Sequence, residues 1–147
     1  MEFEYTPREE LESRVARFQK ALQENEIAGA LISQSVDLFY FSGTIQSSYL
    51  FIPAQGKPVL AVQKSFERAQ EESNLDQIVP LKSTSHLGQA LSDFNFSMEG
   101  QIGLELDVLP VKHYFSLCKA LLLFRVGRFA NRLALALTGS YNQHYQP

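Results

Sequence analysis

Apolar residues recur every three or four positions near the start of the chain, which is the spacing of an amphipathic helix. The members of this stripe are Leu11, Val15, Phe18 and Leu22. Thr6 precedes Pro7, and Glu9 stands three residues after Thr6. A threonine and a glutamate at this spacing are typical of a capping box, and proline suits the first helical position. The pattern therefore predicts a capped helix that ends near residue 25.

Short apolar runs alternate with further helical patterns in the rest of the chain. We expect strands at residues 27–32, 49–52, 58–62, 77–81 and 101–106, the second and third joined as a hairpin by residues 53–57. We expect helices over residues 64–72 with Ser65 as N-cap, from a Ser85 cap to about residue 94, and from Pro110 onward. Pro80 cannot donate to a ladder, so the fourth strand should lie at an edge. Residues 36–41 fit either a helix or a strand.

This alternation predicts an α/β fold, a mixed β-sheet with helices on both faces. The length of 147 residues, with 45% apolar side chains, is enough for one compact domain with its own core. We see no internal repeat, low-complexity tract or flexible linker before about residue 123.

Charge is unevenly distributed along the chain. Residues 1–107 hold 8 Lys and Arg against all 16 Asp and Glu, a net charge of −8, whereas residues 108–147 hold five basic residues and no acid. A negative surface disfavours binding to nucleic acid, because the phosphate backbone requires cations. We therefore expect no nucleic-acid partner.

The chain carries one cysteine, Cys118, among apolar residues of a predicted helix. A lone thiol in such a setting is expected to be a buried structural residue, and its use favours a reducing compartment. The N-terminal residues lack the layout of a secretory signal, and the longest apolar run, residues 120–124, is too short to span a bilayer. We therefore expect a cytoplasmic protein without a membrane partner.

No complete catalytic or metal-binding constellation is present. The three histidines, His86, His113 and His144, are far apart and are expected to be ordinary surface or partly buried residues. Glu105 and Asp107 stand at the end of a predicted strand and point to the same face. Two such carboxylates, together with Asp37, could bind a divalent cation as in a nuclease, and this is the one catalytic alternative that we consider. Solvated acids at a loop mouth are the simpler interpretation. Gly43 and Thr44 offer a turn whose amides could hold an anion, and Gly43 is expected to require a positive φ.

Three ordered stretches of the chain carry a family resemblance. They are residues 30–32 followed by 37–43 (DLFYFSG), residues 49–53 (YLFIP) with 57–60 and 66–69, and residues 102–111 (IGLELDVLPV). In this order and spacing, residues 7–123 resemble the N-terminal domain of the creatinase, prolidase and Xaa-Pro aminopeptidase family.

The resemblance implies a two-domain parent enzyme. Its N-terminal domain has ribonuclease-H-like topology, assists dimer or tetramer formation and helps to shape the substrate pocket. Its C-terminal pita-bread domain holds two metal ions, often manganese, cobalt or zinc, in the peptidases. The pocket residues implied for this chain are Tyr40, Gly43, Thr44, Ser48 and Tyr49. For Tyr40 and Tyr49, ordinary packing of the ring is the alternative.

The resemblance therefore implies a non-catalytic domain with no metal or other cofactor of its own. Its partners would be another copy of the chain and a catalytic domain that is absent. A free-standing α/β module that binds a small ligand or a protein is the alternative function.

The end of the chain departs from the family pattern. We expect the family-type domain to span residues 1–123 and residues 124–147 to form an atypical tail without acids. Either the gene is truncated and read out of frame from near Leu121, or the domain stands alone with a divergent C-terminal helix. The first explanation accounts for the abrupt change in charge and predicts that the tail fits the core poorly.

Overall fold

The computed structural model describes residues 4–94, 96, 101–105, 110–120, 125 and 126. The helices in this part are α1 (Arg8–Glu24), α2 (Ser35–Ser42), α3 (Phe66–Glu72), α4 (Leu87–Ser92) and α5 (Val111–Ala120), with a short 3-10 helix, η1 (Thr84–His86), before α4. The strands are β1 (Gly29–Ile32), β2 (Ser48–Pro53), β3 (Val59–Val62), β4 (Gln77–Pro80), β5 (Gln101–Leu104) and β6 (Arg125–Val126). The segment around residues 36–41, undecided from its pattern, is therefore helical.

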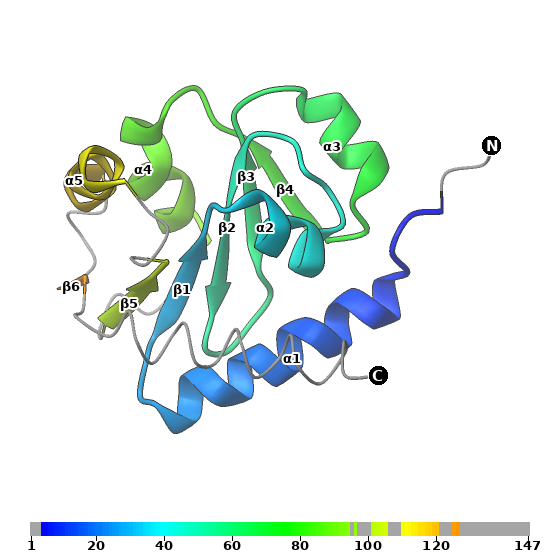
Figure 1. The fold of residues 1–147 in the computed structure, drawn as a ribbon, viewed down its shortest axis with the longest axis horizontal. Coiled ribbons are helices and arrows are strands. Elements are labelled where there is room, and N and C mark those ends of the chain that lie inside the picture. The colour runs from blue at the N-terminus through cyan, green and yellow to red at the C-terminus, as the bar shows by residue number, and fades with distance from the viewer. Residues whose placement is uncertain (1–3, 95, 97–100, 106–109, 121–124, 127–147) are drawn as a thin grey trace.

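The strands form one sheet in the order β4-β3-β2-β1-β5-β6 (Figure 1). β1, β2 and β3 make an antiparallel meander, in which Ala30 lies opposite Ile52 and Leu50 opposite Leu60. β5 pairs parallel with β1, and β6 pairs parallel with β5. This is the ribonuclease-H-like arrangement that the sequence resemblance implied. β4 is added parallel to β3 at the outer edge, so the expected edge strand is confirmed.

One face of the sheet is covered by α1, α2 and α3. Alternate strand residues, among them Ala30, Leu50 and Leu60, point into this layer, as the two-residue period of a strand requires. All four residues of the predicted stripe on α1 are buried, and Val15, Phe18 and Leu22 belong to this layer. Phe18 of α1 packs against Phe41 of α2, with ring centroids 5.1 Å apart. Among the described residues, this layer holds the larger of the two cores.

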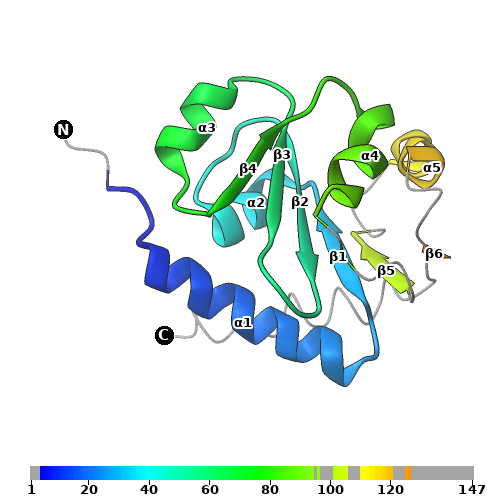
Figure 2. The ribbon, with the colours of Figure 1, turned by 180° about the vertical axis from the view of Figure 1, so that it is seen from behind.

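The opposite face is covered by α4 and α5, which lie together on the other side of the sheet in both views (Figures 1 and 2). Leu31, Phe51 and Ala61, the neighbours of the strand residues just described, point into this second layer and meet Leu87 and Leu117 of the helices. Helices therefore cover both faces of a mixed sheet, which confirms the predicted fold class.

Two of the predicted helix caps are wrong. α1 starts one residue later than expected, with Pro7 at the N-cap and no side-chain cap. Thr6 instead accepts a hydrogen bond at its carbonyl from Asn74 Nδ2, at 2.7 Å. Ser85 does not cap α4, because the chain first makes η1 and His86 takes the N-cap position. Ser65 does precede α3, but without a capping hydrogen bond. Tertiary contacts and turn geometry took precedence over local capping in each case.

Several predictions fall outside the described residues. Asp107, His144 and most of the tail lie there, and so do the side chains of Cys118, Arg125 and Val126. The boundary at residue 123 stays a prediction, although β6 places residues 125 and 126 beside β5. Within the described part, no helix is long and apolar enough to cross a membrane.

Candidate functional site

The loop of residues 43–47 connects α2 to β2 and contains two of the five residues expected at a pocket. Gly43 opens it at φ +84° and ψ 2°, and its amide donates to the carbonyl of Phe39 at 2.9 Å. A positive φ of this kind favours glycine over any residue with a Cβ atom. The backbone requirement predicted for Gly43 is therefore confirmed.

Thr44 points into the protein and is fully buried. Its hydroxyl donates to Glu72 Oε2 at 2.7 Å and accepts from the backbone amide of Gln46 at 3.2 Å. The Gln46 side chain also donates from Nε2 to the carboxylate of Glu72, at 3.3 Å to each oxygen. One carboxylate at the end of α3 thus holds two side chains of the loop.

A second set of contacts fixes the start of the loop. Ser42 Oγ donates to the carbonyl of Leu38 and accepts from the amide of Thr44. Ser73, which follows α3, donates from its hydroxyl to the carbonyl of Ser42. The end of α3 therefore contacts the loop on both sides of Gly43.

Glu72 is charged at neutral pH although its side chain is mostly covered. Burial acts to raise its pKa, but hydrogen bonds from Thr44, Gln46 and Arg68 outweigh this effect, and the pKa lies below its ordinary value of 4.5. Arg68 contributes an ion pair one helical turn away, with 2.9 Å between Nε and Oε1. An ionised carboxylate accepts stronger hydrogen bonds than a neutral group.

Apolar side chains gather on the outer surface beside this loop. Ile45 is 62% exposed, Val36 54% and Phe39 45%. These three side chains line a groove of about 320 Å³, and we call all the residues that line this groove the contact surface. The groove is lined by Thr6, Arg14, Ser35, Val36, Phe39, Tyr40 and Ile45. Exposed apolar side chains that cluster around a groove mark an interaction surface more often than isolated ones do.

Tyr40 lies at the base of this groove and is itself buried. The guanidinium of Arg14 sits 4.5 Å from the centre of its ring, and Arg14 Nη1 donates to the Tyr40 carbonyl at 2.8 Å. Arg14 Nε is paired with Glu10 at 3.0 Å. A cation above an aromatic face is attracted by the ring quadrupole. The ring of Tyr40 therefore serves mainly as a packed wall of the groove.

The remaining expected pocket residues do not converge with Tyr40. Ser48 is buried and donates to the carbonyl of Gln46 at 2.7 Å. Tyr49 points to the opposite face of the sheet, where its hydroxyl is 3.0 Å from Thr84 Oγ1 and hydrogen-bonded to His113 Nε2. Tyr49 and His113 therefore have structural partners.

The acids that suggested a nuclease are only partly brought together. Glu105 follows β5, is buried, and accepts hydrogen bonds at Oε1 from the amides of Ser33 and Gln34, at 2.7 and 3.1 Å. Desolvation and then the neighbouring Asp37 raise the pKa of Glu105 to about 8. Among the described residues no three His, Cys, Asp or Glu side chains lie close enough to hold a metal ion. The raised pKa of Glu105 favours a neutral carboxyl group there.

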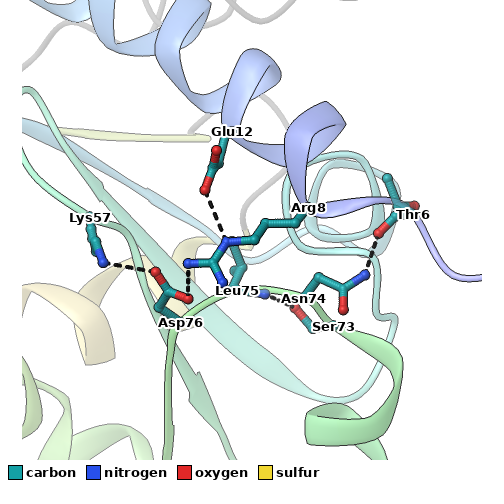
Figure 3. Close-up of polar contacts among 8 residues, drawn as sticks. All are labelled: Thr6, Arg8, Glu12, Lys57, Ser73, Asn74, Leu75 and Asp76. Carbon is teal, nitrogen blue, oxygen red and sulfur yellow. Dashed lines mark hydrogen bonds and ion pairs between the residues drawn. The ribbon is translucent and has the colours of Figure 1, made fainter.

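Another charged cluster joins α1 to the loop between β2 and β3 and to the residues just before β4 (Figure 3). Asp76 pairs with Arg8 and with Lys57, the latter at 2.8 Å, and Arg8 also pairs with Glu12 at 3.1 Å. These residues line a cavity of about 240 Å³ between α1 and the β2–β3 hairpin. Since each cation in it already has an anion, the cluster fastens α1 to the sheet and offers no free charge.

Comparison with known proteins places the chain in a family. The sequence profile of the Creatinase/Prolidase N-terminal domain matches residues 14–132. The chain belongs to this family. The match continues past residue 123 into the expected tail. No curated protein sequence matches the chain.

Solved structures agree with the fold. The N-terminal domain of the cytoplasmic peptidase PepQ from Mycobacterium tuberculosis has a TM-score of 0.68 at 18% identity, over 84% of this chain and 98% of that one. An Xaa-Pro aminopeptidase from Streptococcus thermophilus has a TM-score of 0.69 at 12% identity, over 86% of this chain and 98% of that one. The Xaa-Pro dipeptidase from Bacillus anthracis has a TM-score of 0.67 at 16% identity, over 79% of this chain. The match covers only 33% of that longer chain.

Sequence reasoning missed Arg68 and Glu72, which organise the loop, and Arg14, which packs on Tyr40. Arg68 and Glu72 are an i,i+4 pair, which is common on exposed helices and gave no reason to expect a tertiary contact. Only the fold shows that α3 ends beside Gly43.

Proposed function

We propose that this domain is a non-catalytic accessory part of a metal-dependent Xaa-Pro peptidase. It would supply contacts between copies of the chain and one wall of the substrate pocket. Hydrolysis next to proline would belong to a catalytic domain outside this sequence. The three relatives above are described as peptidases, and this supports the assignment of the reaction class. We also propose a cytoplasmic location, as in the name of the PepQ relative.

The observation that carries the proposal is the contact surface of α2 and the 43–47 loop. An isoleucine, a valine and a phenylalanine lie exposed around one groove there. Covering them with another protein surface would be favourable, since burying apolar area stabilises an assembly. Tyr40, Gly43 and Thr44, three of the residues implied for the pocket, lie directly beneath or beside these side chains.

The described residues do not fit the two-metal centre that the family implies for its peptidases. Such a centre requires several convergent carboxylate or imidazole ligands, and no group of three is found in the described part. Asp37 and Glu105 are the nearest approach, and the raised pKa of Glu105 disfavours the charged form that a metal ion requires. We therefore propose that the metal ions bind in the catalytic domain.

Self-association tests the proposed contact surface. We expect sedimentation velocity to show a concentration-dependent dimer for the wild-type chain. The double variant Phe39→Ser with Ile45→Ser should weaken dimerisation by at least about tenfold, because large apolar side chains dominate such contacts. Val111→Ser with Phe115→Ser is the matched control, since both residues are similarly exposed on α5. A monomer at all concentrations, or equal loss in the control, would contradict the proposal.

Activity measurements test the proposal that this domain does not itself hydrolyse peptides. The chain alone, supplied with Mn²⁺ and an X-Pro dipeptide or tripeptide, should show no turnover above a metal blank. Turnover above the blank would overturn the non-catalytic assignment.

A free-standing binding module is the second candidate function. The groove beside Tyr40 would be its ligand site, because it combines apolar walls with the polar side chains of Thr6 and Ser35. A monomeric wild-type chain that binds a small, mainly apolar ligand and loses this binding in Phe39→Ser would favour this candidate.

A further inference from the structure

We infer that Glu72 is the positioning residue of the contact surface, holding the 43–47 loop so that Thr44 is inside and Ile45 outside. This inference rests on the proposed function, in which the contact surface meets another protein surface.

The exposure of Ile45 needs a structural cause. A loop isoleucine that could turn inward would gain free energy by burying its apolar side chain. Its neighbours prevent this rotation, because Thr44 before it is fully buried and Gln46 after it is tied to Glu72. Ile45 is therefore held outward by the residues on each side of it.

Both oxygens of Glu72 are used in this arrangement. Oε2 accepts from Thr44 Oγ1 at 2.7 Å, while Oε1 accepts from Arg68 Nε at 2.9 Å, and Gln46 Nε2 reaches both. The ion pair with Arg68 fixes the direction of the carboxylate on α3. Because Glu72 has one oxygen for each task, a shorter or neutral side chain cannot reproduce the whole set.

The ends of the loop are held independently of Glu72. At one end, Gly43 closes α2. At the other end, the carbonyl of Ser47 accepts a hydrogen bond of 2.8 Å from the amide of Gln63, the residue that follows β3. The part that depends on Glu72 is therefore the centre of the loop, residues 44–46. Glu72 itself belongs to neither hydrophobic core, so its removal should loosen the loop without opening the sheet.

Amide exchange measures the positioning directly. In Glu72→Ala the amides of Thr44 and Gln46, which donate to Ser42 Oγ and Thr44 Oγ1, should exchange at least about tenfold faster, because their local opening becomes easier. The amide of Leu50 in β2 should keep its protection. Glu71→Ala is the matched control, since Glu71 is an exposed glutamate next to Glu72 on the same helix.

Variants of Thr44 separate the hydrogen bond from general packing. Thr44→Val keeps the shape of the side chain but removes both the donor to Glu72 and the acceptor of the Gln46 amide. The measured amide is therefore that of residue 44, which donates to Ser42 Oγ and should exchange faster, as in Glu72→Ala. Thr44→Ser restores the donor and should return exchange to within about twofold of the wild type. Equal exchange in Thr44→Val and Thr44→Ser would overturn the inference.

Dimerisation decides whether the positioning matters for the contact. Glu72→Ala should weaken dimerisation by about threefold to tenfold, less than the double variant of Phe39 and Ile45, because the apolar side chains remain. Faster loop exchange with unchanged dimerisation would overturn the role of Glu72 in the contact surface. A wild-type chain that stays monomeric would instead refute the proposed function, and the exchange experiments would still decide whether Glu72 holds the loop.

Discussion

The carboxyl group of Asp37 acts on that of Glu105 and raises its pKa, where the end of β5 meets the first turn of α2. The two residues are far apart in the sequence and meet because β5 pairs parallel with β1, after which the chain turns into α2. Oε1 of Glu105 is occupied by two backbone amides, whereas Oε2 is buried and receives no hydrogen bond from any other described donor. A buried oxygen without a donor disfavours the charged carboxylate.

The first prediction concerns stability against pH. The pKa of Glu105 is raised from 4.5 to about 8 in the folded chain. A raised pKa means that the folded state holds a proton that the unfolded state releases, so this stabilisation is complete below pH 4.5 and disappears as pH rises through 8. The free energy of unfolding should fall by up to about 1.4 kcal/mol per pH unit between these values. Urea unfolding at pH 5, 7 and 8.5 measures this.

The variant Asp37→Asn serves as the test of cause. An asparagine amide can donate to an ionised Glu105 without a proton, so the pH dependence should flatten. Glu24→Gln, at an exposed position of α1, should leave the slope unchanged. A steep slope that persists in Asp37→Asn would show that the burial of Glu105, and not its contact with Asp37, sets the raised pKa.

Gly43→Ala should destabilise the chain by about 1–2 kcal/mol, because alanine is strained at φ +84°. A Cβ atom there would make only ordinary van der Waals contacts, the nearest with the Glu72 carbonyl oxygen at 3.5 Å, so the cost is conformational. The midpoint of urea unfolding measures the effect. An unchanged midpoint would mean that the loop can adopt another turn.

Phe18→Ala should destabilise the chain by about 3–5 kcal/mol through loss of buried area and the cavity left against Phe41. Phe115→Ala, which removes an exposed ring from α5, should stay within about 0.5 kcal/mol of the wild type. Equal losses in the two variants would contradict the assignment of the larger core.

Tyr49→Phe should destabilise the chain by about 1–2 kcal/mol, because it leaves Thr84 and His113 without their buried hydroxyl partner. Its effect on dimerisation should be negligible, since Tyr49 lies on the face opposite the contact surface. Thermal unfolding and sedimentation velocity check these two outcomes separately. Weakened dimerisation would restore Tyr49 to the proposed pocket.

The fold was predictable because its elements have clear periods. The stripe from Leu11 to Leu22 and the short apolar runs identify the helices and strands, and Pro80 correctly indicates an edge. The segment of residues 36–41 could not be assigned, since its dense apolar run satisfies both periods until one knows which residues face the sheet. The caps predicted at Thr6 and Ser85 were wrong because a capping pattern considers only neighbouring residues. Thr6 makes a tertiary contact with Asn74, and Ser85 belongs to the 3-10 helix before α4.

The candidate site was less predictable than the fold. Gly43 is readable from a glycine at a helix end. The roles of Thr44 and Glu72 depend on a contact across 28 positions of sequence, and no local pattern encodes such a pair. The five residues implied by the family resemblance lie within one short stretch of the chain. Adjacent residues of a strand point to opposite faces of the sheet, and Tyr49 therefore lies on the face opposite Tyr40.

The layering of the sheet sets an order in which the chain can acquire structure. Everything that α1, α2 and α3 cover lies between residues 8 and 80, whereas β5 and α5 come only after residue 100. During synthesis the N-terminal layer can close first, while β1 still presents the edge that β5 will occupy. An unpaired edge of this kind invites pairing with a neighbouring chain. A chain whose synthesis stops before residue 101 would lack β5. Its β1 edge would stay unpaired, and the chain would therefore be prone to strand-mediated aggregation.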